Sequence, residues 1–194
     1  MIWQSKVPPR VVFFSWSASF GKILTIDNLH KSCVLELDRC YMHKRCGESV
    51  DHPLLHCPIA WELWSLVFYL FGIHWVMPHT VLELFEAWQG RFVWHHHIDV
   101  WRLVPHCLIW CIWHERNARS LKGCERSLLE MKCFFLHTLF EWSVVFSHFS
   151  CYLFLFFLII VLLILDFCPH STSPMCCLFV FRENNALSLI KKVK

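Results

Sequence analysis

The stretch from Cys40 to Cys57 constrains this chain more than any other part of its sequence. Six of its eighteen residues carry side chains that can bind zinc: Cys40, His43, Cys46, His52, His56 and Cys57. Zinc in structural sites prefers four thiolate or imidazole ligands in a closed tetrahedron, and short spacings let one small loop supply several of them. The stretch therefore predicts a structural zinc site built on a loop.

Composition and charge favour an intracellular domain over a secreted one. The 194 residues are 56% hydrophobic and 17% charged, below the roughly 25% charge of an average soluble domain. The twelve cysteines follow no regular spacing, and residues 1–10 lack the basic start and apolar run of a signal peptide. We therefore expect a reducing compartment, cytoplasm or nucleus, in which thiols bind metal or pack. A net charge of +3 does not by itself indicate a nucleic-acid partner.

Three zones of different composition organise the chain. Residues 1–142 alternate apolar runs with polar breaks and predict a domain, whereas 166–194 form a mixed tail that we expect to be disordered. The zone between them, 143–165, contains no Asp, Glu, Lys or Arg. A membrane-spanning helix needs about 20 predominantly apolar residues. The run from 144 to 165 therefore predicts a single transmembrane helix, and a membrane location if it inserts.

Helix signals outnumber strand signals in residues 1–142, so the predicted fold class is mainly α. Proline at a first turn, glycine at an end, or apolar side chains at helical spacing predict helices at about 8–20, 25–29, 58–72, 78–89, 101–119 and 125–142. We expect Thr25 to cap the helix that follows it and Asp51 to cap the next one. We also expect Pro105 to interrupt the fifth helix.

A series of short phrases follows in a fixed order along residues 2–142. They are Ile2–Trp16, Gly21–Leu29, Glu48–Cys57, Ala60–Trp64 and Trp110–Arg119. Together they resemble the zinc-binding domain that follows the reverse transcriptase in plant non-LTR (LINE-type) retrotransposon polyproteins. The resemblance implies a small helical domain whose ligands are a Cys-x2-Cys pair followed by one histidine and one cysteine.

Carried over position by position, the resemblance implies four ligands of Zn2+: Cys40, His43, His52 and Cys57. The family's second cysteine falls on His43, whose imidazole can also bind zinc but needs more room than a thiolate. Cys46 could replace His43, and His56 is a further alternative because it lies four residues after His52. The remaining alternative is a degenerate site in which these side chains only pack or face solvent.

The resemblance and the basic loop also suggest RNA or DNA as a partner. Four cationic side chains are candidates for phosphate contacts: Lys44, Arg45, Arg116 and Arg119. The chain has no Tyr-x-Asp-Asp signature and no nucleophile or phosphate-loop motif. We therefore expect no enzymatic activity, no catalytic residues and no small-molecule substrate. The predicted function is a non-catalytic, zinc-binding part of a retrotransposon polyprotein; the alternative is a single-pass membrane protein with a degenerate zinc site.

Overall fold

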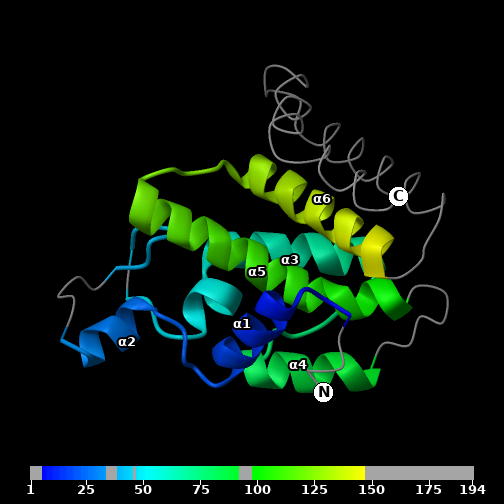
Figure 1. Cartoon of the computed structure of the whole chain (residues 1–194), viewed down its shortest axis with the longest axis horizontal. Coiled ribbons are helices and arrows are strands. Elements are labelled where there is room, and N and C mark those ends of the chain that lie inside the picture. The colour runs from blue at the N-terminus through cyan, green and yellow to red at the C-terminus, as the bar shows by residue number, and fades with distance from the viewer. Residues whose placement is uncertain (1–5, 34–38, 46, 92–97, 147–194) are drawn as a thin grey trace. The chain divides into compact units, whose positions relative to one another are not determined.

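The structure, a computed structural model, describes residues 6–33, 39–45, 47–91 and 98–146 (Figure 1). These ranges contain helices and no β-strand, which confirms the predicted mainly α fold class. The elements are α1 (Pro9–Ser19), α2 (Ile26–Lys31), the π-helical turn η2 (His52–His56), α3 (Pro58–Phe71), α4 (Val81–Arg91), α5 (Ile98–Lys122) and α6 (Leu128–Phe146).

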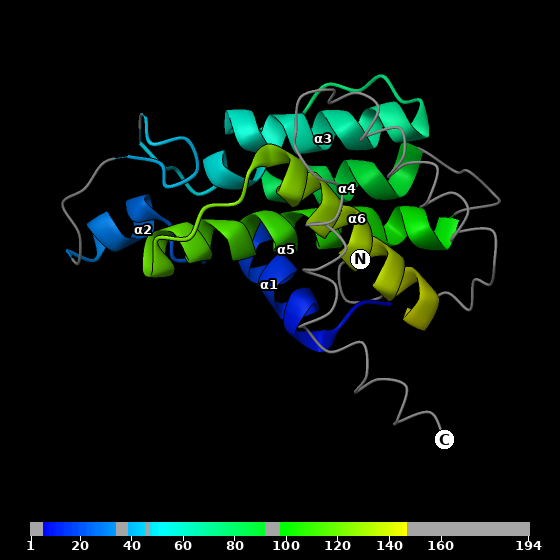
Figure 2. The same ribbon diagram turned by 90° about the horizontal axis from the view of Figure 1, so that it is seen from above.

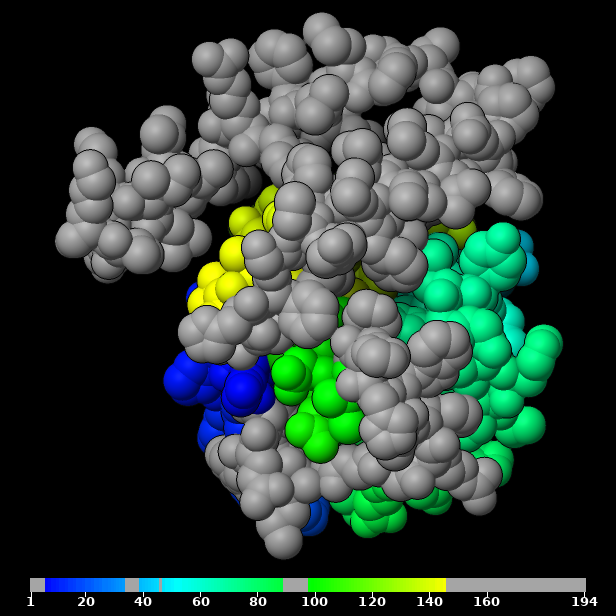
Figure 3. Space-filling view, turned by 90° about the vertical axis from the view of Figure 1, so that its right-hand side faces the viewer, coloured from blue at the N-terminus to red at the C-terminus, as the bar shows by residue number. Residues whose placement is uncertain are grey.

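Helix α5 is the central element of the described residues. It contacts α1, α3, α4, α6 and η2. Figure 1 shows α6 above α5 and α1 and α4 below it, and Figure 2 shows α3 and α1 on opposite sides of it. Seven consecutive residues, 103–109, are buried, so α5 is covered all round at this point. Figure 3 shows one face, with α3 in blue-green next to green residues of α4 and α5 and yellow residues of α6.

Pro105 lies inside α5 without ending it, so the predicted interruption is wrong. Proline has no N–H, and the carbonyl four residues earlier, that of Trp101, therefore lacks its usual helical partner. The indole Nε1 of Trp88 on α4 donates to this carbonyl at 3.0 Å. The rings of Trp88 and Trp101 also stack, with centroids 4.0 Å apart. A side chain from a neighbouring helix thus replaces the backbone bond that proline removes.

Local signals place the two ends of α3 correctly. Pro58 is its first residue, where a missing N–H costs nothing because the first turn leaves its N–H groups unpaired. Gly72 follows its last residue with φ +61°, the left-handed conformation that glycine adopts without steric penalty. These residues act through their own backbone preferences, so the sequence alone predicts them.

Two predicted helix caps have different partners in the structure. The Thr25 hydroxyl does not cap α2, since its buried Oγ1 has no hydrogen-bond partner. The N–H of Ile26 donates instead to the Glu48 carboxylate at 3.2 Å. The Asp51 carboxylate accepts from the N–H of Val81 at 2.9 Å and so caps α4, thirty residues later, rather than the turn that follows it.

An aromatic cluster joins α3, α4 and α5. The rings of Trp64 and Trp88 meet edge to face at 5.7 Å, and those of Phe71 and Trp101 do so at 4.9 Å. The Trp64 indole N–H donates to the Leu54 carbonyl at 2.9 Å, as a buried indole requires. The ring contacts are therefore made among α3, α4 and α5, and the bond to Leu54 joins this cluster to η2.

The predicted transmembrane segment, 143–165, lies outside the described residues except for 143–146, which end α6. No helix in the described part of the chain combines the length and the apolar character needed to cross a membrane. The chain divides into two units, 1–149 and 150–194. The predicted tail, 166–194, also lies outside the described residues.

Candidate metal centre

Residues 40–45 form a closed turn at the centre of the candidate site. The N–H of Lys44 donates to the Cys40 carbonyl at 2.8 Å, and the N–H of Cys40 donates to the Arg45 carbonyl at 3.0 Å. Lys44 has φ +60°, a left-handed conformation that reverses the chain within a few residues. Two hydrogen bonds thus fix the backbone that carries Cys40 and His43.

The π-helical turn η2 brings Cys57 next to His52. Its wide hydrogen bond runs from the N–H of Cys57 to the His52 carbonyl at 2.7 Å, five residues apart. His56 is exposed, and its Nε2 donates to the carbonyl of His79 at 2.9 Å. The structure therefore places Cys57 and His52 together and His56 elsewhere. Cys46, the other alternative ligand, lies outside the described residues.

Four side chains converge between the turn and the start of α3: Cys40, His43, His52 and Cys57. Their ligand atoms all lie within 4.8 Å of one another. The Sγ of Cys57 is 3.7 Å from Nδ1 of His43, and the rings of His43 and His52 have centroids 5.1 Å apart. Tetrahedral zinc needs such atoms about 3.3–3.8 Å apart, given bonds of about 2.3 Å to sulfur and 2.0–2.1 Å to nitrogen. The widest separation in the cluster would have to contract by about 1.0–1.5 Å to hold the ion.

The two thiols are fully buried and share their protons unequally. The hydrogen bond between them, followed by burial, raises the pKa of Cys40 to about 12. The same hydrogen bond lowers the pKa of Cys57 to about 7 against the effect of burial, and the N–H groups of Ile59 and Ala60 act in the same direction. The bond with Cys40, helped by the first turn of α3, therefore favours a thiolate at Cys57, the form that binds a metal.

A buried nitrogen in the cluster supports metal binding. The Nε2 of His52 is inaccessible to solvent and has no hydrogen-bond partner, although buried polar atoms normally have one. A side-chain hydrogen bond with His52 lowers the pKa of Cys40, against the larger effects of Cys57 and burial, so the His52 ring borders the cluster. A metal ion bound by the cluster would give this nitrogen the partner it lacks.

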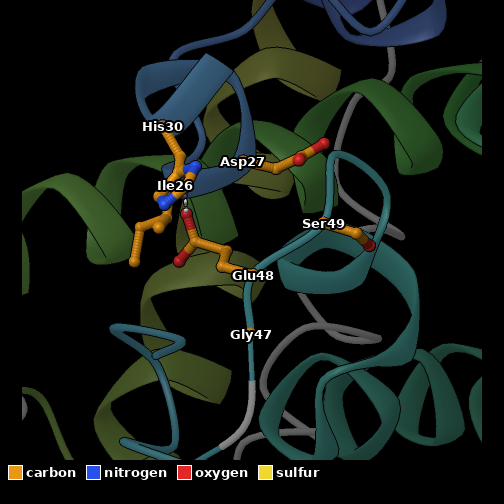
Figure 4. Close-up of a pocket in the computed structure, with 6 residues that line it drawn as sticks. All are labelled: Ile26, Asp27, His30, Gly47, Glu48 and Ser49. Atoms are coloured by element: carbon orange, nitrogen blue, oxygen red, sulfur yellow. Dashed lines mark hydrogen bonds between the residues drawn. The ribbon is translucent and has the colours of Figure 1, made fainter. Parts of the chain in front are cut away.

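Glu48 connects the metal-binding turn to two helices, a role that its sequence context does not indicate. The residue is buried, with 1% exposure. Its carboxylate accepts hydrogen bonds from the N–H of Ile26 and of Tyr41, both at 3.2 Å, and from Nη2 of Arg116 at 2.7 Å. Figure 4 shows it directed toward the start of α2, at the edge of a hollow that Asp27, His30 and Ser49 also line.

Arg116 is an internal ion-pair partner in the structure. Its side chain is 5% exposed and bonds to Glu48, whose side chain is fully buried. The guanidinium lies 5.0 Å from the ring centroids of both Tyr41 and Trp113. The predicted phosphate contact of Arg116 does not fit this placement, because the guanidinium is buried, pairs with Glu48 and lies against two aromatic rings.

Arg119 ties the last turns of α5 to the metal-binding turn. Its Nη1 donates to the carbonyl of Met42 at 2.6 Å, and its Nε donates to Glu115 at 2.8 Å. Only 7% of its side chain is exposed. The predicted phosphate contact of Arg119 therefore does not fit either. The sequence shows charged residues at Glu115–Arg119 inside an aromatic helix, which indicates buried ion pairs. It does not show which residues pair with them, because Glu48 and Met42 lie far away along the chain.

Lys44 and Arg45 are the exposed members of the predicted phosphate-binding set. Both lie on the metal-binding turn. The Lys44 side chain is 57% exposed and forms an ion pair with Glu125, which is a weak interaction at such exposure. These two cations are available to an anionic partner, whereas Arg116 and Arg119 are not.

Residues 1–64 match the family described as zinc-binding in reverse transcriptase. The match covers about a third of the 194 residues and includes all four members of the cluster. It stops well before Arg116 and Arg119, which contact the turn from α5. No match was found among the curated proteins or among the solved structures.

Proposed function

We propose that this chain is a structural zinc-binding protein in which one Zn2+ is held by Cys40, His43, His52 and Cys57. The observation that carries the proposal is the convergence of their four ligand atoms within 4.8 Å. Zinc bound there would tie the turn to the start of α3 and contribute directly to folding. Four protein ligands close the tetrahedron and leave no position for a reacting water, which favours a non-catalytic role.

We infer further that the chain belongs to a plant LINE-type retrotransposon polyprotein. Two findings support this origin: the match of residues 1–64 to the reverse-transcriptase-associated zinc-binding family, and the ordered phrases along residues 2–142. In such a context the domain would act next to a polymerase and inside the cell.

Nucleic acid is the partner that we propose for the metal-binding turn. Lys44 and Arg45 are exposed side by side on it, and cationic groups of this kind contact phosphates without reading sequence. The zinc would fix the backbone that presents them. Their contribution would be electrostatic and would fall as the salt concentration rises.

Metal content of the purified full-length chain, measured by atomic emission, tests the zinc proposal. We expect about one zinc per chain in the wild type and none in Cys40→Ser/Cys57→Ser. Cys124→Ser is the matched control, because Cys124 is exposed and remote from the cluster in sequence. A wild-type protein purified with zinc in the medium that still lacks the metal would contradict the proposal.

A second set of variants distinguishes the alternative ligands. His56→Gln and Cys46→Ser should retain the zinc, and His43→Gln or His52→Gln should lose most of it. Loss of zinc in Cys46→Ser together with its retention in His43→Gln would show that Cys46 is the ligand in place of His43. The proposed set of four would then be incorrect.

A further inference from the structure

Helix α1 presents a row of aromatic side chains to solvent. Phe13 and Phe20 are 62% and 55% exposed, and Trp16 lies half-buried between them. The spacing of i, i+3 and i+7 places the three on one face of the helix. The opposite face, which includes Val11 and Phe14, is buried against the rest of the domain. The aromatic row is therefore not required for the core.

The three rings lie next to one another with their planes tilted, by 34° between Phe13 and Trp16 and by 52° between Trp16 and Phe20. The centroids of Phe13 and Trp16 are 6.1 Å apart, and those of Trp16 and Phe20 are 5.3 Å apart. Neighbouring exposed apolar side chains of this size mark an interaction surface more often than single ones do. Flat aromatic rings in a row offer a partner stacking surfaces, in addition to apolar area.

One cation, Lys22, lies against the aromatic row, and a second, Arg10, precedes the row on α1 and lies over Trp110 of α5. The exposed Arg10 precedes Phe13 by one helical turn, with its guanidinium 5.6 Å from the ring of Trp110. The ammonium of Lys22 lies 5.4 Å from the ring of Trp16. No acidic residue occurs from Lys6 to Ile26. This charge distribution complements an anionic partner and would disfavour a purely apolar one, which would bury the cations without compensation.

We propose that this α1 aromatic surface, Arg10, Phe13, Trp16, Phe20 and Lys22, binds single-stranded nucleic acid. Unpaired bases stack on the aromatic rings, and the phosphates between them lie near the two cations. Every base has an aromatic face, so binding is tolerant of sequence. The inference rests on the proposed function in one respect, that nucleic acid is the partner, but its residues are separate from the metal-binding cluster.

Fluorescence anisotropy of a labelled oligothymidine about 12 nucleotides long, titrated with the full-length protein, tests this surface. Phe13→Ala/Phe20→Ala should weaken binding about tenfold or more, since each stacked base contributes strongly to affinity. Tyr69→Ala is the matched control: Tyr69 on α3 is an aromatic residue that is 70% exposed outside the surface. It should change the affinity less than about twofold. Circular dichroism confirms that each variant is folded.

Salt dependence separates the cations from the rings. Lys22→Ala should reduce the slope of log affinity against log salt by about 0.7, the value for one phosphate contact on a single strand. Lys31→Ala should leave the slope unchanged, because Lys31 forms an ion pair with Asp27 on α2. A duplex of the same length should bind at least about tenfold more weakly, because its bases are already stacked.

Three results would overturn the inference: unchanged binding by Phe13→Ala/Phe20→Ala, an equal loss in Tyr69→Ala, or equal affinity for the duplex. Zinc content measured on the same samples keeps it distinct from the proposed function. A protein without zinc whose oligothymidine binding depends on Phe13 and Phe20 would support this surface and contradict the metal proposal. A zinc-containing protein that does not bind oligothymidine would support the metal proposal and contradict this surface.

Discussion

At the scale of single residues, Glu48 has the most consequential environment in the domain. Its carboxylate joins the N–H of Ile26, the N–H of Tyr41 and the guanidinium of Arg116, which belong to α2, the metal-binding turn and α5. A sequence pattern cannot reveal this, because a buried glutamate and an exposed one look alike until the partner is known. The partner here is 68 residues away. The cysteines and histidines of the cluster, by contrast, are close in sequence and recognisable by type.

Glu48→Gln should lower the free energy of unfolding by about 3–5 kcal/mol. The substitution keeps the shape of the side chain but leaves the Arg116 charge buried without its counter-ion. Urea titration of the full-length protein measures the change. Glu62→Gln is the control, because Glu62 is 55% exposed and only 3.9 Å from Lys132; it should cost less than about 1 kcal/mol. A similar small cost at Glu48 would contradict the structural role given to it.

His106 should make the domain less stable in mild acid. Burial lowers its pKa to about 4 from the usual value of 6.5, while its Nδ1 lies 2.8 Å from the Ser15 hydroxyl. The unfolded chain therefore binds a proton at higher pH than the folded one, so stability is complete above about pH 6.5 and falls as the pH drops toward 4. The loss attributable to this residue is up to about 3 kcal/mol.

Thermal unfolding of wild type and His106→Gln across this pH range measures the contribution of His106. The variant should show a flatter pH dependence than the wild type, whatever its stability at pH 7. His74→Gln, at an exposed position, should keep the slope of the wild type. Parallel curves for wild type and His106→Gln would show that His106 is protonated equally in the folded and unfolded states.

At the scale of elements, the sequence predicts where helices form, but it does not predict the helix features that depend on a residue far away along the chain. Pro58 and Gly72 bound α3 through their own backbone preferences, so a local pattern is sufficient. The continuity of α5 through Pro105 depends on Trp88, which lies on another helix. The start of α4 depends in the same way on Asp51, a residue of the metal-binding region. Long-range partners of this kind decide where local rules fail.

A double-mutant cycle on Trp88 and Pro105 tests the bond that keeps α5 intact. Trp88→Phe should destabilise the domain by about 1–3 kcal/mol, because the buried Trp101 carbonyl loses its donor. In a Pro105→Ala background the alanine N–H can bond to that carbonyl, and the same substitution should cost less. Chemical denaturation of the four proteins gives the difference. Additive costs would mean that the indole and the proline act independently.

Arg119 should influence metal affinity from outside the set of ligands. Its bond to the Met42 carbonyl holds the turn between Cys40 and His43 against α5. Arg119→Ala should weaken zinc binding about 10- to 100-fold, as the loss of an outer-shell contact does in other zinc sites. Competition with a chromophoric chelator measures the affinity. Arg102→Ala, an exposed position on the same helix, should leave the affinity unchanged.

At the scale of the whole molecule, the domain combines two centres of stability. One is the aromatic cluster of α3, α4 and α5, and the other is the Cys/His cluster with α2 and η2 around it. Helix α2 has only six residues, too few to be stable by itself. It depends on Glu48 and on the turn that the metal would close, whereas the ring contacts of the aromatic cluster are made among α3, α4 and α5.

Removal of zinc should therefore unfold part of the domain before the rest. After treatment with a chelator, hydrogen exchange should become fast in 22–33 and 39–57 and remain slow in α3 and α5, as expected for separate cooperative units. Mass spectrometry of proteolytic peptides resolves these segments. Uniform acceleration over all described helices would mean that the metal stabilises one cooperative unit, and no acceleration would mean that zinc has no structural role.

The ion pair between Glu48 and Arg116 has a consequence for where this domain ends. The segment that matches the zinc-binding family stops at residue 64, but one charge of the pair lies beyond that boundary. The segment defined by sequence similarity is thus too short to include Arg116, the partner of the buried Glu48 carboxylate. A shortened protein made for study would need to extend through α5 for the metal-binding turn to keep its supports.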